Sequence, residues 1–439
     1  MSKTLAIDNR QFLEAQNASR IERIARSQVF KRLDRIAIGC IRLVEGAESY
    51  AFGEREEHAR LSATVHVKHP AFYKALAFGG SVGAGEAYME GHWTCSDITA
   101  LLRIIIRNRS VLEGVDRGLA WLTAPAKRLL HWFNRNTVTG SKRNIAAHYD
   151  LGNEFYKLFL DETMTYSSGI FETTESTLHE ASIAKYDRIC RKLALTREDH
   201  VMEIGTGWGG FAIHAAENYG CRVTTTTISK EQHAFARKRI EERGLSDRIT
   251  LLHEDYRNVT GTYDKLVSIE MIEAVGHQYL ETFLAKMSAL LKPEGKAVLQ
   301  AITIEDQQYK QHTRNVDFIK RYIFPGCCLL SVTALCEKAT KATDLRLFHL
   351  EDITPHYATT LKKWRDRFMA RLDEVRAMGF ASTFIRMWEF YLCYCEAAFA
   401  EQYIGNVQAV FFKPGCREAT PLAAFPEAPD RLVTEGRVS

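Results

Sequence analysis

Short apolar runs alternate with amphipathic stretches along the second half of the chain, and this alternation predicts its fold. Each run is short enough for a buried strand, and the stretches between runs carry apolar residues at helical spacing. The predicted strands are Val201–Ile204, Arg222–Thr227, Ile249–His253, Lys265–Ile269 and Ala297–Ile304, and the predicted helices are Gly210–Asn218, Lys230–Arg243 and Tyr279–Leu291. Lys292–Gly295 is predicted to be a turn. The alternation is typical of an α/β protein with a doubly wound parallel sheet, which binds its ligand at the carboxyl ends of the strands.

The N-terminal part of the chain has a different pattern, which predicts a smaller mixed domain. Residues 1–35 have helical spacing, Ala37–Val44 and Leu61–His69 are β-like, and a glycine-rich passage, Gly79–Gly91, precedes a helical segment at Ile98–Arg107. A chain of 439 residues also exceeds the usual size of one domain. The predicted division is an accessory domain at 1–117, a basic amphipathic segment and linker at 118–143, the larger domain at 144–412 and a loose tail at 413–439.

The first predicted strand of the larger domain runs into a glycine-rich turn, Gly205–Gly210, that is suited to a nucleotide-like cofactor. Glycines let the backbone turn sharply and approach a ligand, and the following helix begins there. The spacing also satisfies the dinucleotide pattern, which requires an acid roughly 20 residues further on. That zone is Thr224–Thr227, without a carboxylate, whereas Glu203 precedes the first glycine. This order resembles class I S-adenosylmethionine (SAM) methyltransferases; a NAD site and a ligand-free turn are the alternatives.

Composition and charge exclude some classes and suggest a location. The net charge of +4 argues against a general nucleic-acid binder. Residues 101–143, however, contain nine basic and two acidic residues, and Trp121 and Trp132 lie in the same stretch. That zone suits either a membrane surface or a solvated interdomain helix. The ten cysteines lack metal-site spacing, so we expect reduced thiols and no metal ion. No apolar signal segment or 18-residue apolar run occurs, which predicts a cytoplasmic protein, peripheral on the inner face of the membrane.

Several motifs, taken in order, resemble those of the cyclopropane-fatty-acyl-phospholipid synthases and their mycolic acid relatives. The resemblance covers most of the chain. The motifs are GEAYMEGHW at Gly85–Trp93 with Asp97, His148-Tyr149-Asp150 followed by Asn153, Phe155 and Tyr166-Ser167, the G-x-G-W-G loop with Trp208, Thr227-Ile228-Ser229 with Gln232, Val275-Gly276, and the RYIFPG stretch at Arg321–Gly326.

This resemblance implies a SAM-dependent methyltransferase and assigns its cofactor residues. Tyr166 and Ser167 would cover the methionine end, with Glu203, Gly205 and Gly207 at the glycine loop. Thr227, Ser229 and Gln232 would lie near the ribose, and Asp255 and Tyr256 near the adenine. Without the resemblance, Asp255–Arg257 would be interpreted as an ordinary turn after a strand.

The family reaction adds a methyl group to an acyl double bond, and a bound bicarbonate then removes a proton. By resemblance the bicarbonate residues are Glu273, the main chain at Ile302, and Tyr357. Two others depart from the family: Ser168 stands for its Cys and Gln300 for its His. Glu270 occupies a position that is often Gly, and Ala274 replaces another His. We therefore expect a retained methyltransferase scaffold with an altered base site. On the residues alone, Glu270 and Glu273 could cap the next helix, and Tyr357 could be core.

The expected product is a cyclopropane fatty acid on membrane phospholipid, with a methyl- or methylene-branched chain as the alternative. The expected partners are unsaturated phospholipid acyl chains at a membrane surface, no nucleic acid, and a second copy in a homodimer, which the sequence leaves open. A small-amine N-methyltransferase, a non-catalytic lipid-binding relative and, more remotely, a dehydrogenase are the competing interpretations. The aromatic residues of Trp388–Phe399 are expected in the core or in an acyl-pocket wall.

Overall fold

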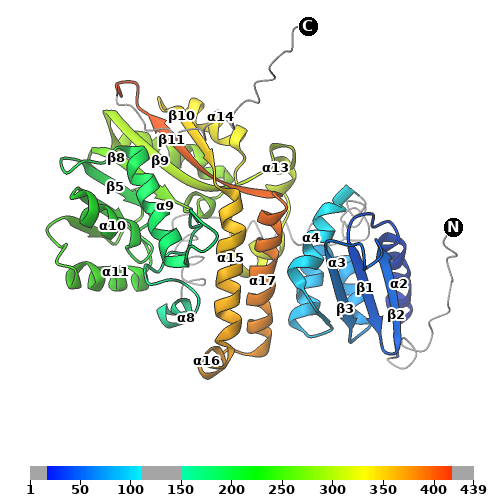
Figure 1. Cartoon of the computed structure of the whole chain (residues 1–439). Helices are drawn as coiled ribbons and strands as arrows, with labels where there is room; N and C mark the ends of the chain where they lie inside the picture. The colour runs from blue at the N-terminus through cyan, green and yellow to red at the C-terminus, as the bar shows by residue number, and fades with distance from the viewer. Residues whose placement is uncertain (1–16, 111–150, 418–439) are drawn as a thin grey trace, which may run out of the picture.

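The computed structural model describes residues 17–110 and 151–417, which form two packed units (Figure 1). The linker prediction, its two predicted domain boundaries, the His148–Asp150 motif and most of the basic zone lie outside these residues. No helix within the described ranges combines the length and apolar character needed to cross a bilayer.

The N-terminal unit is a four-stranded sheet covered by helices. Strand order is β2-β1-β3-β4, with β1 and β3 parallel and the other pairs antiparallel. Its elements are α2 (Arg20–Leu33), β1 (Cys40–Glu45), β2 (Glu48–Gly53), β3 (Ser62–Val67), α3 (Ala71–Met89), β4 (Trp93–Cys95) and α4 (Ile98–Arg107). A capping box formed by Ser19 and Glu22 starts α2, and the Asp97 carboxylate caps α4.

The glycine-rich passage is part of a helix. Helix α3 runs on to Met89 past a kink at Gly80, whose backbone has φ 59° and ψ −137°. A region that suggests a loop by composition is therefore a kinked helix, because its glycines allow close packing against other segments. Gly85 is the clearest case, since a Cβ there would lie 2.5 Å from the Phe318 ring.

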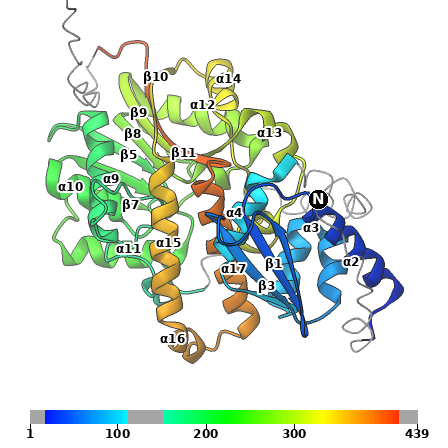
Figure 2. The same ribbon diagram turned by 45° about the vertical axis from the view of Figure 1, so that its right-hand side comes forward.

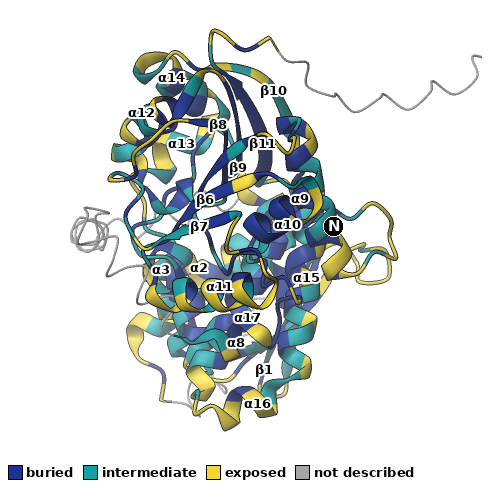
Figure 3. Cartoon of the chain, turned by 90° about the vertical axis from the view of Figure 1, so that its left-hand side faces the viewer, coloured by how far each residue is buried: buried dark blue, intermediate teal, exposed yellow. Residues whose placement is uncertain are grey.

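The larger unit contains a seven-stranded sheet of order β10-β11-β9-β8-β5-β6-β7. The five predicted strands are present as its parallel part, while β11 pairs antiparallel with both β9 and β10. The strands are β5 (His200–Ile204), β6 (Arg222–Thr226), β7 (Ile249–Leu252), β8 (Tyr263–Ile269), β9 (Leu291–Ile304), β10 (Arg346–Asp352) and β11 (Ile404–Phe412). The sheet is thus mixed, and its central strands are buried (Figure 3).

Helices cover both faces of this sheet. They are α8 (Asn153–Lys157), α9 (Leu178–Leu193), α10 (Gly210–Tyr219), α11 (Lys230–Glu242), α12 (Leu280–Leu290), α13 (Asp306–His312), α14 (Val332–Ala342), α15 (Thr354–Ala370), α16 (Leu372–Ala377) and α17 (Ser382–Ala400), with short turns η2 (Ile272–Ala274), η3 (His277–Tyr279) and the π-helical η4 (Ile319–Ile323). The prediction of a separate turn at Lys292–Gly295 is wrong, because these residues belong to β9. They form a bulge inside β9, where the pairing with β8 shifts.

The long helices α15 and α17 stand between the large sheet and the N-terminal unit, and α17 packs against α3 and α4 (Figures 1 and 2). Ion pairs strengthen this contact: Glu401 accepts from Arg103 and Arg107 at 2.6 and 2.7 Å. Arg109 pairs with Glu305 at 3.0 Å. The described part of the basic zone is therefore engaged within the molecule.

Candidate active site

A continuous cavity of about 1390 Å³ begins at the carboxyl ends of the parallel strands and extends to the N-terminal unit. Its polar part is lined by residues that follow β5, β6, β8 and β9. Its apolar part reaches α2, α3 and α4. This is where a doubly wound sheet is expected to bind its ligand.

The glycine turn shapes one wall of the cavity. Gly205 and Gly207 have φ of 103° and 53°, a left-handed backbone that favours glycine, and both line the cavity. The main-chain N–H groups of Gly205 and Thr206 donate to the Thr226 carbonyl, which joins the turn to β6. The turn therefore presents its backbone directly to the cavity.

Glu203 lies behind this turn at the end of β5. It is buried, lines the cavity, and accepts a hydrogen bond from the Thr225 hydroxyl at 2.6 Å. Burial raises the pKa of Glu203 to about 8, although Thr225 and Lys185 oppose this. A cationic group reaching this carboxyl would favour its ionised form.

The residues assigned to the nucleoside follow β6 and β7. Thr227 donates to the Gln232 side chain at 2.9 Å, and both line the cavity. Ser229 instead caps α11 by accepting from the Gln232 N–H, and it is absent from the lining. Asp255 and Tyr256 line the cavity as predicted, but Asp255 also closes its own turn through Arg257, at 2.6 Å. The turn interpretation is confirmed by this ion pair, while the role of Asp255 and Tyr256 near the adenine stays a prediction.

Tyr166 and Ser167 lie in the segment that precedes α9. The Tyr166 hydroxyl bonds to that of Tyr391 at 2.8 Å, and Ser167 accepts a hydrogen bond from the Lys185 ammonium at 2.8 Å. All four residues line the cavity. Tyr166 and Tyr391 come from distant segments, so the two sides of the chamber meet here.

Three of the five residues predicted to hold bicarbonate, Ser168, Gln300 and Tyr357, donate to a carboxylate of the chain itself, that of Glu270. Its Oε1 accepts from the Ser168 main-chain N–H (3.1 Å), the Gln300 amide (2.7 Å) and the Asn406 amide (2.5 Å). Its Oε2 accepts from the Tyr357 hydroxyl at 2.7 Å. Burial, and then Glu270, raise the pKa of Tyr357 well above its usual value, so this phenol remains a donor.

Glu270 and Tyr357 line the cavity, whereas Ser168 and Gln300 are fully buried behind it. The Ser168 hydroxyl donates to the Gly169 carbonyl rather than toward the cavity. These two residues support the carboxylate and do not face the chamber.

The backbone of Glu270 is left-handed, with φ 49°. A side chain in this conformation costs roughly 1–2 kcal/mol, which explains why glycine suits the position. A glutamate held here against that cost, in a cavity wall, indicates a functional carboxylate.

Glu273 lies beside Glu270, in η2, and also lines the cavity. Its Oε1 accepts from the Ile302 N–H at 2.5 Å, while its Oε2 is buried without a hydrogen-bond partner among the described residues. Burial, followed by the charge of Glu270, raises the pKa of Glu273 to about 8. Glu273 is thus neutral at pH 7, and it does not act as a helix cap.

A chain of buried amides extends behind Glu270. Gln300 accepts from Gln408 at 3.0 Å, and Gln408 accepts from the Lys192 ammonium at 2.6 Å. Lys192 is also paired with Glu351, at 2.5 Å. Since Lys192 can only donate, it fixes the orientation of both amides so that Gln300 presents N–H to Glu270.

An aromatic and aliphatic chamber adjoins this carboxylate. Phe390, Tyr391, Tyr394 and Phe399 of α17 line it, and Tyr357 of α15 lies beside them in the lining. Beyond them the lining is aliphatic, with Leu33, Leu76, Val82, Leu102 and Ile105 from the N-terminal unit. Basic side chains also line the cavity, namely Arg32, Arg109, Lys310 and Arg314. A long apolar molecule with an anionic end fits this lining.

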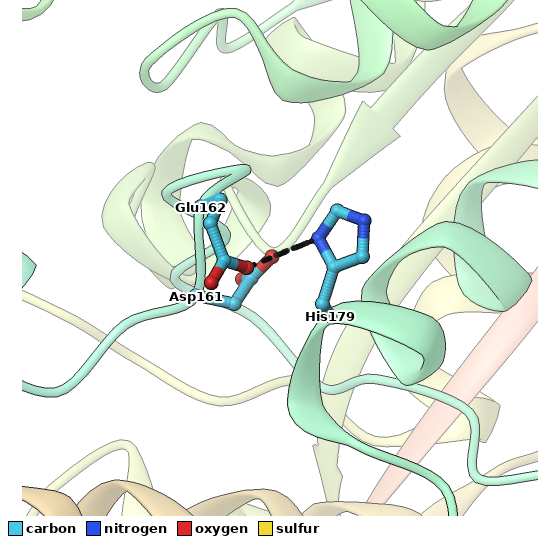
Figure 4. Close-up of side chains that lie close together, drawn as sticks. All are labelled: Asp161, Glu162 and His179. Atoms are coloured by element: carbon cyan, nitrogen blue, oxygen red, sulfur yellow. Dashed lines mark hydrogen bonds and ion pairs between the residues drawn. The ribbon is translucent and has the colours of Figure 1, made fainter.

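Among the described residues, Asp161, Glu162 and His179 form a group with metal-ligand chemistry that lies outside the cavity lining (Figure 4). The Asp161 oxygens accept from the Thr163 N–H and hydroxyl and from the Ser182 hydroxyl, so they stabilise a turn. The group has a structural explanation and contains none of the predicted site residues.

The structure thus gathers most of the predicted residues around one cavity, with Ser168, Gln300 and Ser229 behind its walls. Their roles remain predictions. The sequence predictions missed Lys185, Lys192, Asn406 and Gln408. A usable signal was present for Asn406 and Gln408, since they are polar residues two apart in an apolar strand and face the same side.

Comparisons with known proteins agree with this geometry. Residues 136–409 match the family model described as mycolic acid cyclopropane synthetase. Tuberculostearic acid methyltransferase UfaA1 of Mycobacterium tuberculosis is 38% identical over 76% of this chain and 80% of its own length. Cyclopropane-fatty-acyl-phospholipid synthase of Escherichia coli is 34% identical over 80% of this chain and 87% of its own. The crystal structure of mycolic acid cyclopropane synthase CmaA1 complexed with SAH and CTAB superimposes with a TM-score of 0.58 and 29% identity, over 62% of this chain and 98% of that one.

Proposed function

Because this chain belongs to the mycolic acid cyclopropane synthetase family of SAM-dependent methyltransferases, we propose that it methylates the double bond of an unsaturated acyl chain with Glu270 as the proton acceptor. The observation that carries this proposal is the set of four donors on the Glu270 carboxylate, in a cavity wall.

The residues of the polar wall fit SAM. Two left-handed glycines expose backbone to the cavity, with open space at Gly207 where a Cβ would stand. Tyr166, Ser167, Glu203 and Gln232 would hold the cofactor with that turn. When bound, SAM supplies an electrophilic methyl group.

The chain's own residues would then manage the positive charge on the acyl chain. Bond formation between the methyl carbon and one alkene carbon leaves a cation on the other alkene carbon. Aromatic faces such as those of Tyr357 and Phe399 stabilise a nearby cation by roughly 0.5–2 kcal/mol each. Glu270 Oε2 has one hydrogen-bond donor and room for a proton, whereas Oε1 already has three. Oε2 is therefore the atom we assign to proton removal.

Bicarbonate does not fit this site as it stands. The Ser168 N–H, the Gln300 amide and the Tyr357 hydroxyl are engaged by Glu270, and the Ile302 N–H is engaged by Glu273. A second carboxylate-like anion would lack donors and would meet the charge of Glu270. We propose that the reaction needs no bicarbonate.

The product we propose is a branched chain that keeps a double bond, in place of the cyclopropane expected from the sequence. Two observations support this choice: the base site differs from the bicarbonate pattern, and one similar relative is a tuberculostearic acid methyltransferase. A hydride shift to the cationic carbon, followed by loss of a methyl proton to Glu270, gives a methylene branch and balances the reaction. Cyclopropane is the second candidate, supported by the similarity to the Escherichia coli synthase.

For the substrate carrier we propose an anionic phospholipid at the inner face of the membrane. The aliphatic part of the cavity suits an acyl chain, and Lys310 and Arg314 are exposed cations on its lining. Cations near a bilayer attract anionic headgroups by about 1 kcal/mol each.

The test uses the purified full chain with SAM and liposomes of cis-unsaturated phosphatidylglycerol, in bicarbonate-depleted and bicarbonate-supplemented buffer. We expect fatty acids heavier by CH2, with equal yield in both buffers, and exocyclic methylene signals in proton NMR. Cyclopropane signals would favour the second candidate. A requirement for bicarbonate would overturn the role of Glu270. Bound SAM without any lipid product would redirect the search to small amines or to a lipid-binding role.

A further inference from the structure

We infer that Lys185 is a cofactor-binding residue whose ammonium, together with the Ser167 hydroxyl, holds the carboxylate of the methionine portion of SAM. This inference rests on the SAM dependence of the family and is independent of the proposed lipid product.

Lys185 is a buried cation in the cavity wall. It lies on α9, its side chain is fully buried, and it belongs to the lining. Its ammonium donates to Ser167 Oγ at 2.8 Å and lies 4.2 Å from the centre of the Tyr186 ring. An ammonium has three N–H donors, and the described residues accept from only one of them.

The charges around Lys185 leave a place for an anion. Within the described residues it forms no ion pair, although Glu270, Asp161 and Glu203 are near enough to influence it electrostatically. Glu270 is held by its own four donors, and Asp161 by Thr163 and Ser182. Burial without a direct counter-ion lowers the pKa of Lys185 to about 8. A buried charge is stabilised by a paired, hydrogen-bonded partner, which a ligand carboxylate would provide.

Ser167 is suited to share that ligand. Its oxygen accepts from Lys185, so its hydrogen points elsewhere and remains able to donate to the same carboxylate. The amino-acid portion of SAM carries both a carboxylate and an ammonium. Lys185 and Glu203 both line the cavity and offer an ammonium and a carboxyl group, so the two residues together match a zwitterion.

The test compares ligands that differ only in the carboxylate. Isothermal titration calorimetry would measure SAM and decarboxylated SAM binding to the lipid-free full chain and to Lys185→Met. We expect the variant to bind SAM about 10- to 100-fold more weakly, as for loss of a charge-assisted hydrogen bond, and decarboxylated SAM within about twofold of wild type.

Lys192→Met is the matched control, since Lys192 is also a buried lysine on α9 but lies outside the cavity lining. It should leave both affinities unchanged. Ser167→Ala gives a second reading if Lys185→Met does not fold, and it should also weaken SAM selectively. Equal losses for the two ligands, or no loss for SAM, would overturn the inference. If Lys185→Met weakens SAM binding but not the binding of decarboxylated SAM, and the lipid assay gives no product, the inference stands and only the proposed function is wrong.

Discussion

Glu270 combines a left-handed backbone with four hydrogen-bond donors, and the donors come from residues distant in sequence. Its φ of 49° disfavours every residue with a side chain, while the donors stabilise a carboxylate in a wall of the cavity. At this residue the local strain of the backbone is combined with a carboxylate that its hydrogen bonds hold in place.

Glu270→Gly should separate these two contributions. The change relieves the strain but removes the carboxylate, so turnover should fall about 100-fold or more, the range for loss of a general base. Added bicarbonate or acetate should restore part of the activity, because the donors from Gln300 and Tyr357 are freed. Initial rates of methyl transfer with increasing anion measure this, with wild type as the unstimulated control. Full activity without an added anion would show that another group removes the proton.

Glu273 should make the stability of the protein depend on pH. Its pKa is raised to about 8 in the folded chain, against about 4.3 when unfolded. Between these values unfolding releases a proton, so stability falls as pH rises from about 4 to about 8. Glu273→Gln should therefore be more stable than wild type at pH 8, by about 1.4 kcal/mol for each unit of the raised pKa, and nearly equal at pH 4.5. Urea unfolding at both pH values measures this, and a difference independent of pH would contradict it.

Motifs predicted the cofactor side of the cavity better than the base side. Glu203, Gly205 and Gly207 sit in one continuous stretch, so local sequence is enough to place them. The carboxylate site joins Glu270 to donors from four other segments, and Asn406 is brought to it by β11. The resemblance identified Ser168 and Gln300 as altered positions, but their new partner became apparent only from the three-dimensional contacts.

At the scale of elements, the pairing of β9 with β11 determines which side chains lie next to Glu270. Its register places Gln300 opposite Gln408, which allows the amide chain from Lys192 to reach Glu270. A shift of one residue would turn Gln408 to the other face of the sheet. The antiparallel strand is thus a support for the active site.

Lys192→Met should weaken this support without affecting cofactor binding. Without the ammonium, the Gln408 and Gln300 amides lose their fixed orientation, and turnover should fall by about 5- to 10-fold while the SAM affinity stays constant. Steady-state kinetics with calorimetry would separate the two. Arg188→Gln is the control, because Arg188 also contacts Glu351 but has no contact with Gln408. Equal losses in both variants would mean that the ion pair alone matters.

The parallel strands were predictable because each is a short apolar or β-branched run that alternates with helical segments. Strands β10 and β11 were not predicted. β11 comes after the long helices α15 and α17, and it enters the sheet antiparallel, between β9 and β10. The second half of helix α3 was not predicted, because its glycines are not typical of a helix. Their close packing against segments distant in sequence is seen only in the structure.

At the scale of the whole molecule, two distant motifs join the units. Glu86 accepts from Tyr322 at 2.6 Å and pairs with Arg321 at 2.9 Å, while Tyr88 donates to Glu389 at 2.8 Å. The GEAYMEGHW and RYIFPG motifs thus contact each other directly, which gives the first of them a docking role.

A matched pair of glycine variants on α3 would test this junction. At Gly85 a Cβ would lie 2.5 Å from Phe318, whereas at Gly79 it would meet nothing within 4 Å. Gly85→Ala should lower stability by about 1–3 kcal/mol through overpacking, while Gly79→Ala should be neutral or slightly stabilising. Thermal unfolding of both compares them directly. Similar unfolding temperatures for the two variants would show that Phe318 can shift to accommodate a Cβ at position 85 at little cost.

The cavity has walls from both units, and this shared lining has a consequence for the lifetime of the protein. A lipid seated in it touches both halves, so by mass action it favours the state in which they are together. When lipid is scarce, that extra cohesion is absent and the junction opens more often to proteases. We therefore expect the supply of unsaturated lipid to set how long each molecule survives in the cell, in addition to how fast it works.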